Sequence, residues 1–341
     1  MKPLGLILFV VMLLGTLTVA SAPRAIAQTP TPKVPVGVFW YAWFGHDFQT
    51  NTWPGGNGTS HWSNMPSTAM NIRPVSFYSS LDNQTLMWQL AQMHDAGITV
   101  LIASWWGPGD YTDDAIKNLF RYVNATADPI KIAILVEPYA GLDVASAERY
   151  VYGTFYEPYS EHIFEWLGKP LLTFFLPTMP EDNDPDFTIR TVGNGPDADW
   201  NYVAGLPEYV EDTNKPPDDL IHYTNGNRTA FDGEVTVTPR FDNYYEFLQG
   251  GRNDYLRLDV NYTGMFQKLW AYAQTNATLI VITSWNEMTE GSMLEEYISE
   301  TGMHVCPVGF LLNGTSCLNG CELPTSLLTV PLAIAIAVIL L

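Results

Sequence analysis

Basic residues are scarce in this chain of 341 residues, which has 16 lysines and arginines against 36 aspartates and glutamates. The formal net charge is therefore −20. A surface of this sign is repelled by phosphate backbones and by anionic membranes. We therefore expect no nucleic acid among the partners of this protein.

Several motifs of common enzyme classes are also missing. The six histidines form no H-x-H or H-E-x-x-H pattern, which disfavours a metal-dependent hydrolase. No G-x-S-x-G sequence is present, which disfavours an esterase of the α/β-hydrolase type. No glycine-rich phosphate loop follows the first expected strand, which disfavours a doubly wound nucleotide-binding sheet. We expect neither a metal nor a cofactor.

Cysteine is rare, and its three copies, Cys306, Cys317 and Cys321, all follow the last expected strand. A zinc site would need four ligands, and only His304 is near. In an exported chain we expect one disulfide that involves Cys306, with one thiol left over. Residues 301–325 would then form a cysteine-containing stalk.

The N-terminus has the features of an export signal. Residues 1–27 combine Lys2, an apolar run over residues 4–14 and small residues suited to cleavage at 20–22 or 25–27. An uncleaved anchor is the alternative. Residues 28–35 contain three prolines and predict a stiff linker. Export also agrees with N-x-T sequons, which predict surface glycosylation; they begin at Asn57, Asn83, Asn124, Asn227, Asn261, Asn276 and Asn313.

The C-terminal tail, residues 326–341, is apolar and carries no charge. As a helix it would be ~24 Å long, shorter than the ~30 Å hydrocarbon core of a bilayer. It could be a tilted or terminal membrane anchor, or a segment removed when a lipid anchor is attached. We expect a monomer at the cell surface or outside the cell, with attachment to the membrane through this tail as one option.

Between these ends, residues 36–300 alternate strand-like and helix-like patterns, which indicates a parallel sheet. Helices are expected at 82–96, from a cap at Thr112, at 144–152, at 160–167 and around Met265–Tyr272. Eight strands over this length match a single (β/α)₈ TIM barrel, and a doubly wound sheet is the alternative. The expected strands are residues 36–41, 98–103, 131–136, 171–176, 188–192, 199–203, 235–238 and 279–282.

Aromatic residues make up 13% of the chain and include 11 tryptophans. Many occur where an expected strand ends, and at one rim of a barrel they would line a groove that stacks against sugar rings. For each tryptophan alone, core packing is the alternative. The candidate substrate-binding residues are Tyr41, Trp43, His61, Trp105, Trp106, Glu137, Tyr139, Asp242, Trp285 and Asn286.

Two of the charged candidates, Glu137 and Asp242, have a second interpretation. Glu137 could bind a sugar hydroxyl or be a structural carboxylate paired with an arginine. Asp242 and Arg240 could pair with each other. Glu295 and Glu296 are expected on a solvated surface.

The strongest candidates for catalysis are Glu287 and Glu290, which follow the apolar strand at 279–282. At the carboxyl end of a barrel strand, two carboxyl groups can serve as the acid and base that break a glycosidic bond. Burial and mutual repulsion would separate their pKa values. Their spacing alone is compatible with both retaining and inverting geometries.

These motifs resemble glycoside hydrolase family 99, the endo-α-1,2-mannosidases, and its wider circle of related barrel proteins. The resemblance rests on Val-Phe-Trp-Tyr at 38–41, Ser-Trp-Trp-Gly at 104–107, Glu-Pro-Tyr at 137–139 and above all Ser-Trp-Asn-Glu-x-x-Glu-Gly at 284–291. It spans residues 36–296. It implies a (β/α)₈ barrel and retaining cleavage inside α-mannoside chains.

By this resemblance, Glu287 would deprotonate the substrate's own 2-hydroxyl to give an anhydro-sugar intermediate. Glu290 would act as general acid and then as general base. Tyr41, Trp105, Glu137 and Tyr139 match positions that line the family's cleft. The family's usual Glu-Trp-His-Glu-Gly is changed here, because Met288 replaces the tryptophan and Thr289 the histidine.

The sequence therefore predicts an exported glycoside hydrolase that acts on α-linked glycan or polysaccharide chains, with α-mannosides as the candidate substrate. One alternative is a catalytically inactive carbohydrate-binding barrel at the cell surface. A second is a structural surface protein whose barrel is vestigial.

Overall fold

A computed structural model describes residues 34–45, 73–75, 78–178, 180, 184–193, 198–203, 233–242, 257–258, 265–288, 290–298 and 304–305. The predicted signal peptide, all three cysteines and the apolar tail lie outside these ranges. Within the described ranges, no helix combines the length and apolar character needed to cross a bilayer.

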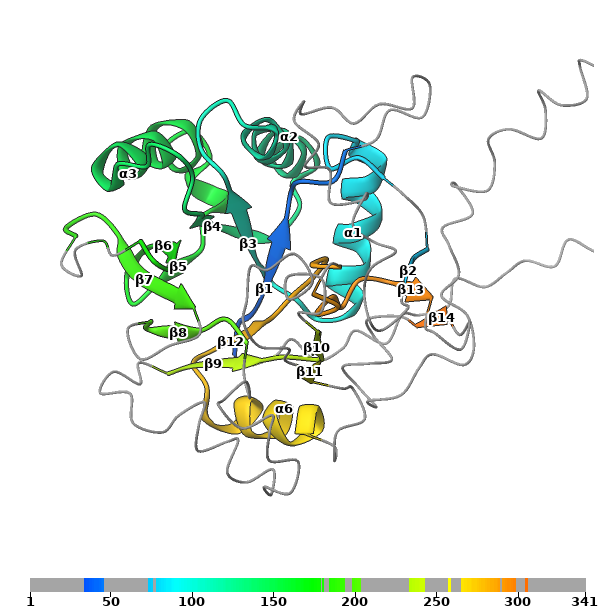
Figure 1. Ribbon diagram of the computed structural model, residues 1–341. Helices are drawn as coiled ribbons and strands as arrows, with labels where there is room; N and C mark the ends of the chain where they lie inside the picture. Colours follow the sequence, from blue (N-terminus) through cyan, green and yellow to red (C-terminus); the bar gives the residue numbers. More distant parts are fainter. Residues whose placement is uncertain are drawn as a thin grey trace, which may run out of the picture. The chain divides into compact units, whose positions relative to one another are not determined.

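The central sheet contains eight parallel strands that follow one another in chain order (Figure 1). The last of them, β12, pairs with β1, so that Val36 lies opposite Ile280. β8 and β9 approach each other, but no pairing joins them in the described residues, and the sheet is a partly closed barrel. The strands are β1 (Val36–Tyr41), β3 (Val100–Trp105), β4 (Lys131–Val136), β6 (Lys169–Phe175), β7 (Thr188–Gly193), β8 (Trp200–Asn201), β9 (Glu234–Val237) and β12 (Leu279–Ile282).

Most of the strands, such as β3 and β12, form where the sequence is largely apolar, as expected for parallel strands covered on both sides. Every residue of β1, β3, β9 and β12 is buried. β3 begins and ends two residues later than the pattern at 98–103 predicted. Its register pairs Tyr41 with Ser104 and Trp105 with Val136. The carboxyl ends of β1, β3 and β4 therefore lie at one rim.

Helices connect the strands on the outer side of the sheet. α2 (Tyr111–Thr126) packs on β3, and α6 (Met265–Asn276) packs on β9. α1 (Asn83–Asp95) confirms the helix predicted at 82–96, and its cap is Asp82, whose side chain accepts a hydrogen bond from the Gln84 N–H. α3 (Val144–Val151) continues into a π-helical turn, Tyr152–Tyr156.

Two helix predictions were wrong in detail. Asp110, not Thr112, caps α2, because its carboxylate accepts the Thr112 N–H at 2.8 Å. The segment 160–167 is only a short 3₁₀ turn, Ser160–His162, followed by β5 (Glu165–Trp166). β5 turns back antiparallel onto β6 through Leu167 and Gly168, which have φ values of 54° and 85°. Such a two-residue turn favours a hairpin over a helix.

Short strands complete the described part. β10 (Phe241–Asp242) pairs with β11 (Arg257–Leu258), and β13 (Tyr297–Ile298) joins β2 (Arg73–Pro74) to β14 (His304–Val305). Three of the sequon asparagines are described, and all three are exposed: Asn83, Asn124 and Asn276.

Candidate active site

Residues 284–295, named here the acidic loop, leave the end of β12 and fold back on themselves. The Ser284 N–H donates to the Ser292 carbonyl at 2.9 Å, and the Glu295 N–H donates to the Trp285 carbonyl at 2.7 Å. The Glu287 N–H donates to Ser284 Oγ at 2.8 Å. The loop thus carries Glu287 and Glu290 as a fixed pair, and their exposed fractions are only 3% and 8%.

Both glutamates lie near Tyr41, the last residue of β1. The Tyr41 hydroxyl donates to Tyr202 Oη at 2.5 Å, and the Tyr202 hydroxyl donates to Glu290 Oε2 at 3.1 Å. Burial raises the pKa of Tyr41 well above its usual value, and the negative charges of Glu137, Glu287 and Glu290 raise it further. Three carboxyl groups from two strand ends therefore converge on one tyrosine.

Glu137 follows β4 and points to the same place. Its backbone N–H donates to the Trp105 carbonyl at 3.0 Å, and Ser104 Oγ donates to its Oε1 at 2.8 Å. Burial raises the pKa of Glu137 to about 8, the Ser104 hydrogen bond opposes this, and the charge of Glu287 adds to it. Most of the Glu137 carboxyl is therefore protonated at pH 7. Neither ion pair found among the described residues involves Glu137, so an arginine partner is not seen there.

Aromatic rings lie beside this group of carboxyls. Tyr41 stacks on Trp43 with ring centroids 4.4 Å apart, and Trp43 lies 6.1 Å from Trp106. Trp43 and Trp106 are partly buried rather than fully enclosed. The Trp106 indole N–H is buried and has no acceptor among the described residues. This N–H and the ring faces are suited to contact a sugar.

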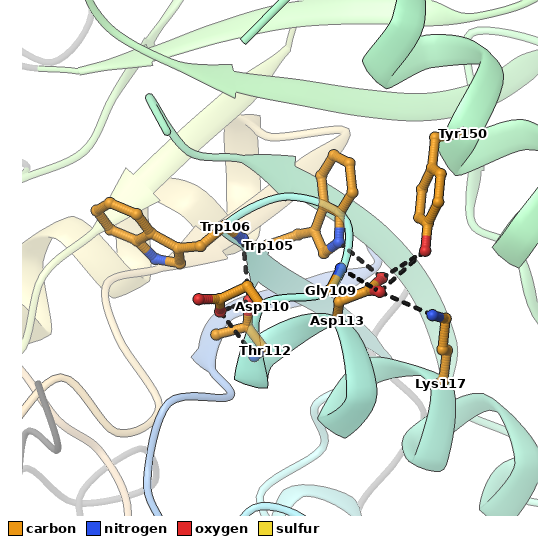
Figure 2. Close-up of polar contacts among 8 residues, drawn as sticks. All are labelled: Trp105, Trp106, Gly109, Asp110, Thr112, Asp113, Lys117 and Tyr150. Carbon is orange, nitrogen blue, oxygen red and sulfur yellow. Dashed lines mark hydrogen bonds and ion pairs between the residues drawn. The ribbon is translucent and has the colours of Figure 1, made fainter. Parts of the chain in front are cut away.

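Trp105 lies on the opposite side of β3, and its prediction as a cleft residue was wrong. Its indole N–H donates to Asp113 Oδ1 at 3.0 Å, and its ring stacks on Tyr150 at 5.3 Å (Figure 2). The side chain is fully buried between β3 and the helices α2 and α3. Successive strand residues face opposite ways, so Trp105 packs in the core while Trp106 turns away from it. Tyr139 packs edge-on against Trp105 at 5.6 Å.

Trp285 and Asn286 have structural roles, which corrects their prediction as substrate-binding residues. Asn286 Oδ1 accepts the Tyr41 N–H at 2.8 Å, and its Nδ2 donates to the Tyr41 carbonyl at 2.9 Å and to Tyr78 Oη at 3.2 Å. These bonds use the amide oxygen and both amide hydrogens. Trp285 is fully buried, and its backbone N–H donates to the Phe39 carbonyl at 2.7 Å.

Arg240, which follows β9, was not predicted to take part in the site, but its side chain donates hydrogen bonds to the acidic loop. Its Nε donates to the Gly291 carbonyl and its Nη2 to the Met293 carbonyl at 2.7 Å. Its guanidinium lies 3.9 Å from the centre of the Tyr297 ring. Pairing with Asp242 is not seen, because the Asp242 side chain lies outside the described part. His61 lies outside it as well.

Two further residues near the site were missed. Tyr202 could have been found, since it lies at the end of the predicted sixth strand. Glu295 was placed on a solvated surface with Glu296, but both are buried, with exposed fractions of 0% and 2%. Nothing in their local sequence signals this burial.

The described site offers acid–base chemistry. Glu137, Glu287 and Glu290 can take up or release protons, and Tyr41 and Tyr202 supply hydroxyls among them. Among the described residues, no three His, Cys, Asp or Glu side chains are arranged so that they could hold a metal ion. The buried carboxyl groups and the flanking aromatic rings are the typical components of a sugar-cleaving site.

No protein-family model matches the chain, and no curated protein matches its sequence. Among solved structures it is similar to two of the GH99 endo-α-mannosidase from Bacteroides thetaiotaomicron, one in complex with bis-tris-propane. Both are 18% identical to this chain, with TM-scores of 0.58 and 0.57. Each match covers 82% of this chain, and the matches cover 94% and 95% of the two solved chains, respectively. A glycoside hydrolase-like protein is 14% identical, with a TM-score of 0.50, over 79% of this chain and 89% of that protein.

Identities this low establish a shared fold rather than a shared activity. The partly closed barrel agrees with that fold. The chain is a distant structural relative of the glycoside hydrolase family 99 endo-α-mannosidases.

Proposed function

We propose that this protein is an exported glycoside hydrolase that cleaves α-linked glycan or polysaccharide chains with retention of configuration. The candidate substrates are α-mannosides, because the structural neighbours from Bacteroides thetaiotaomicron are described as endo-α-mannosidases. The proposal includes closure of the sheet into a complete (β/α)₈ barrel. It also includes a monomer, glycosylation, and attachment to the cell surface through the C-terminal tail.

One observation carries the proposal: the carboxyl groups of Glu137, Glu287 and Glu290, which follow β4 and β12, all lie close enough to Tyr41 at the end of β1 for their charges to raise the pKa of its hydroxyl. Parallel barrels bear their active sites at this end of the strands. Breaking a glycosidic bond requires a proton donor for the leaving oxygen and a second carboxyl group close by. Glu287 and Glu290 meet both needs on a single loop.

In the proposed reaction, Glu287 removes the proton of the 2-hydroxyl, and the resulting oxygen attacks C1 of the same sugar. Glu290 donates its proton to the leaving glycosidic oxygen. Glu290 then takes a proton from water, which opens the anhydro ring at C1, while Glu287 returns its proton to O2. Two inversions at C1 leave the configuration unchanged.

The neighbours of the pair fit these roles. The Tyr202 hydroxyl holds Glu290 Oε2, which fixes the direction of that carboxyl group. Glu137, mostly protonated at pH 7, can donate a hydrogen bond to a sugar oxygen. Trp43 and Trp106 offer ring faces for the apolar side of a pyranose.

The test is a digest of an α-mannan oligosaccharide library, read by mass spectrometry, with wild type beside Glu287→Gln and Glu290→Gln. We expect wild type to release shorter oligosaccharides and both variants to lose this activity. Glu165→Gln, an exposed residue of β5 remote from the loop, is the matched control and should cleave like wild type. Undiminished cleavage by Glu290→Gln would reject the assignment. Glycan binding without cleavage by wild type would favour the carbohydrate-binding alternative.

A further inference from the structure

A chain of buried side chains ties the acidic loop to α1 and to the segment before it. It starts at Glu295, which is fully buried. Glu295 Oε2 accepts the Tyr78 hydroxyl at 2.7 Å, and Oε1 accepts the Gln89 Nε2–H at 3.4 Å. Gln89 Oε1 in turn accepts the Trp40 indole N–H at 3.0 Å. A carboxyl group is thus enclosed with neutral donors around it.

The same chain reaches the catalytic candidates through Asn286. The Tyr78 hydroxyl accepts a hydrogen bond from Asn286 Nδ2 at 3.2 Å. Asn286 holds the backbone of Tyr41 at both its N–H and its carbonyl. Asn286 immediately precedes Glu287, and the hydroxyl of Tyr41 leads through Tyr202 to Glu290. One amide therefore sets the position of both halves of the site.

The hydrogen bonds of this chain have a fixed direction at Tyr78. The Tyr78 hydroxyl has one proton, which it gives to Glu295, and its lone pairs then face the Asn286 amide. Without an acceptor at position 295, that proton is no longer directed away from Asn286. The amide would then lose the partner that fixes its orientation toward Tyr41. A buried polar network left half satisfied loses its rigidity.

We propose that Glu295, acting through Tyr78 and Asn286, is a positioning residue for the Glu287–Glu290 pair. This inference rests on the proposed function, since it assigns Glu295 a part in the reaction of that site. Glu295 touches no reacting atom in this arrangement. It acts on turnover rather than on binding of the glycan, because it determines where the carboxyl groups stand and adds no contact to the substrate.

The protonation state of Glu295 suggests the most useful variants. Burial raises the pKa of Glu295 to about 8, hydrogen bonds from Tyr78 and Gln89 oppose this, and the charge of Glu296 adds to it. The carboxyl group is therefore mostly neutral at pH 7. Glutamine is a close substitute whose amide oxygen can still accept the Tyr78 hydroxyl, and it gives up only the longer bond from Gln89 Nε2 at 3.4 Å. Leucine has a similar size and offers no acceptor.

The first measurement is steady-state kinetics of full-length Glu295→Leu, Glu295→Gln and Tyr78→Phe on α-mannan oligosaccharides at pH 7. We expect kcat to fall about 10- to 100-fold in Glu295→Leu and Tyr78→Phe, since small displacements of reacting groups have effects of this size. KM should stay within about twofold, because glycan contacts are retained. Glu295→Gln should restore kcat to within about threefold of wild type, because its amide oxygen replaces the acceptor.

The matched control is Tyr156→Phe. Tyr156 is also a buried tyrosine whose hydroxyl makes two hydrogen bonds, to the Ile134 N–H at 3.0 Å and to the Leu171 carbonyl at 2.5 Å. It lies against β4 and β6, away from the acidic loop, so its loss should cost comparable stability without lowering kcat. An equal loss of kcat in Tyr156→Phe and Tyr78→Phe would overturn the inference. Should Glu295→Leu fail to fold, Tyr78→Phe still decides the matter.

The second measurement does not depend on activity. Hydrogen–deuterium exchange of peptides from residues 284–296 should be faster in Tyr78→Phe and Glu295→Leu than in wild type, and unchanged in Tyr156→Phe. Unchanged exchange in the first two variants would overturn the inference. Faster exchange with a wild-type protein that cleaves no glycan would reject the proposed function while upholding the positional role of Glu295.

Discussion

Asp113 accepts the indole N–H of Trp105 at 3.0 Å in a fully buried setting. The same carboxylate accepts the Gly109 N–H at 2.9 Å, the Lys117 ammonium at 2.7 Å and the Tyr150 hydroxyl at 2.9 Å (Figure 2). One side chain of α2 therefore fixes the end of β3, the loop that follows it and α3. Since Trp106 lies in sequence between Trp105 and Gly109, Asp113 also holds the backbone that carries the Trp106 ring beside Trp43.

Replacing Asp113 by alanine should destabilise the protein severely. Four donors would lose their common acceptor, and leaving even one buried donor such as the Trp105 indole N–H without a partner costs about 1–3 kcal/mol. The measurement is the free energy of unfolding from urea denaturation. Asp114→Ala is the matched control, because Asp114 is exposed in the same first turn of α2 and should cost less than about 1 kcal/mol. Equal losses in the two variants would contradict the role given to Asp113.

The two neighbouring tryptophans should respond oppositely to truncation. Trp105→Ala removes a fully buried ring and should lower the free energy of unfolding by about 3–5 kcal/mol. Trp106→Ala removes a partly exposed ring and should cost much less stability, but it should raise KM for oligosaccharides because a stacking face is lost. Urea denaturation and steady-state kinetics on the same preparations separate the two effects. A larger stability loss in Trp106→Ala would reverse the assignment of the two faces.

Much of the fold was predictable because its strands are local patterns. Residues 279–282 are apolar throughout, residues 131–136 are apolar after Lys131, and both runs end at polar residues; the structure confirms both as strands. The segment 160–167 failed because a turn at Leu167 and Gly168, rather than a helix, decides its conformation. Pairing of β12 with β1 joins residues at opposite ends of the domain, and the sequence implied it only through the count of strands.

The position of a site residue was predictable where that residue directly follows a strand. It was not predictable where the residue's hydrogen-bond partner is distant in the sequence. Glu137, Glu287 and Glu290 follow strands and do meet near Tyr41. Trp105 was misplaced because the alternation of side chains along a strand puts Trp105 and Trp106 on opposite faces of the sheet. The sequence does not tell which of the two faces the helices cover. Glu295 was misplaced because its partner Tyr78 lies 217 residues away in the chain, and no local pattern encodes that contact.

Stability should fall as the pH rises from about 4.5 to about 8. Burial raises the pKa of both Glu137 and Glu295 to about 8, so the folded protein keeps protons that the unfolded chain releases above about 4.5. Each such group lowers the free energy of unfolding by up to about 1.4 kcal/mol per pH unit in this window. Their stabilising contribution is complete below the unfolded pKa and is lost once the pH passes about 8. Urea denaturation at pH 5 and pH 8 measures the change.

Glu295→Gln should reduce this pH dependence, since glutamine cannot ionise. Its free energy of unfolding should fall less between pH 5 and pH 8 than that of wild type. Glu165→Gln, in which an exposed carboxyl group is replaced, should follow the wild-type curve. If Glu295→Gln followed the wild-type curve instead, Glu295 would not be the buried neutral acid described above.

Arg240 should be important for activity although it does not belong to the Glu287–Glu290 pair. Its side chain is only 3% exposed and donates to two carbonyls, those of Gly291 and Met293, on the loop that carries Glu290. Arg240→Met leaves both carbonyls without their donor, at about 1–3 kcal/mol each. The acidic loop should loosen, so kcat should fall and exchange of residues 284–296 should quicken.

Arg190→Met is the matched control, because Arg190 also lies over an aromatic ring, that of Trp166 at 5.4 Å, but on β7. It should lose about 1 kcal/mol or less from that contact and leave kcat unchanged. Arg240→Lys adds a finer test, since an ammonium keeps the charge but lacks the planar fork that reaches both carbonyls. Full activity in Arg240→Lys would mean that charge alone is needed, whereas a loss close to that of Arg240→Met would show that the loop depends on the two directed hydrogen bonds.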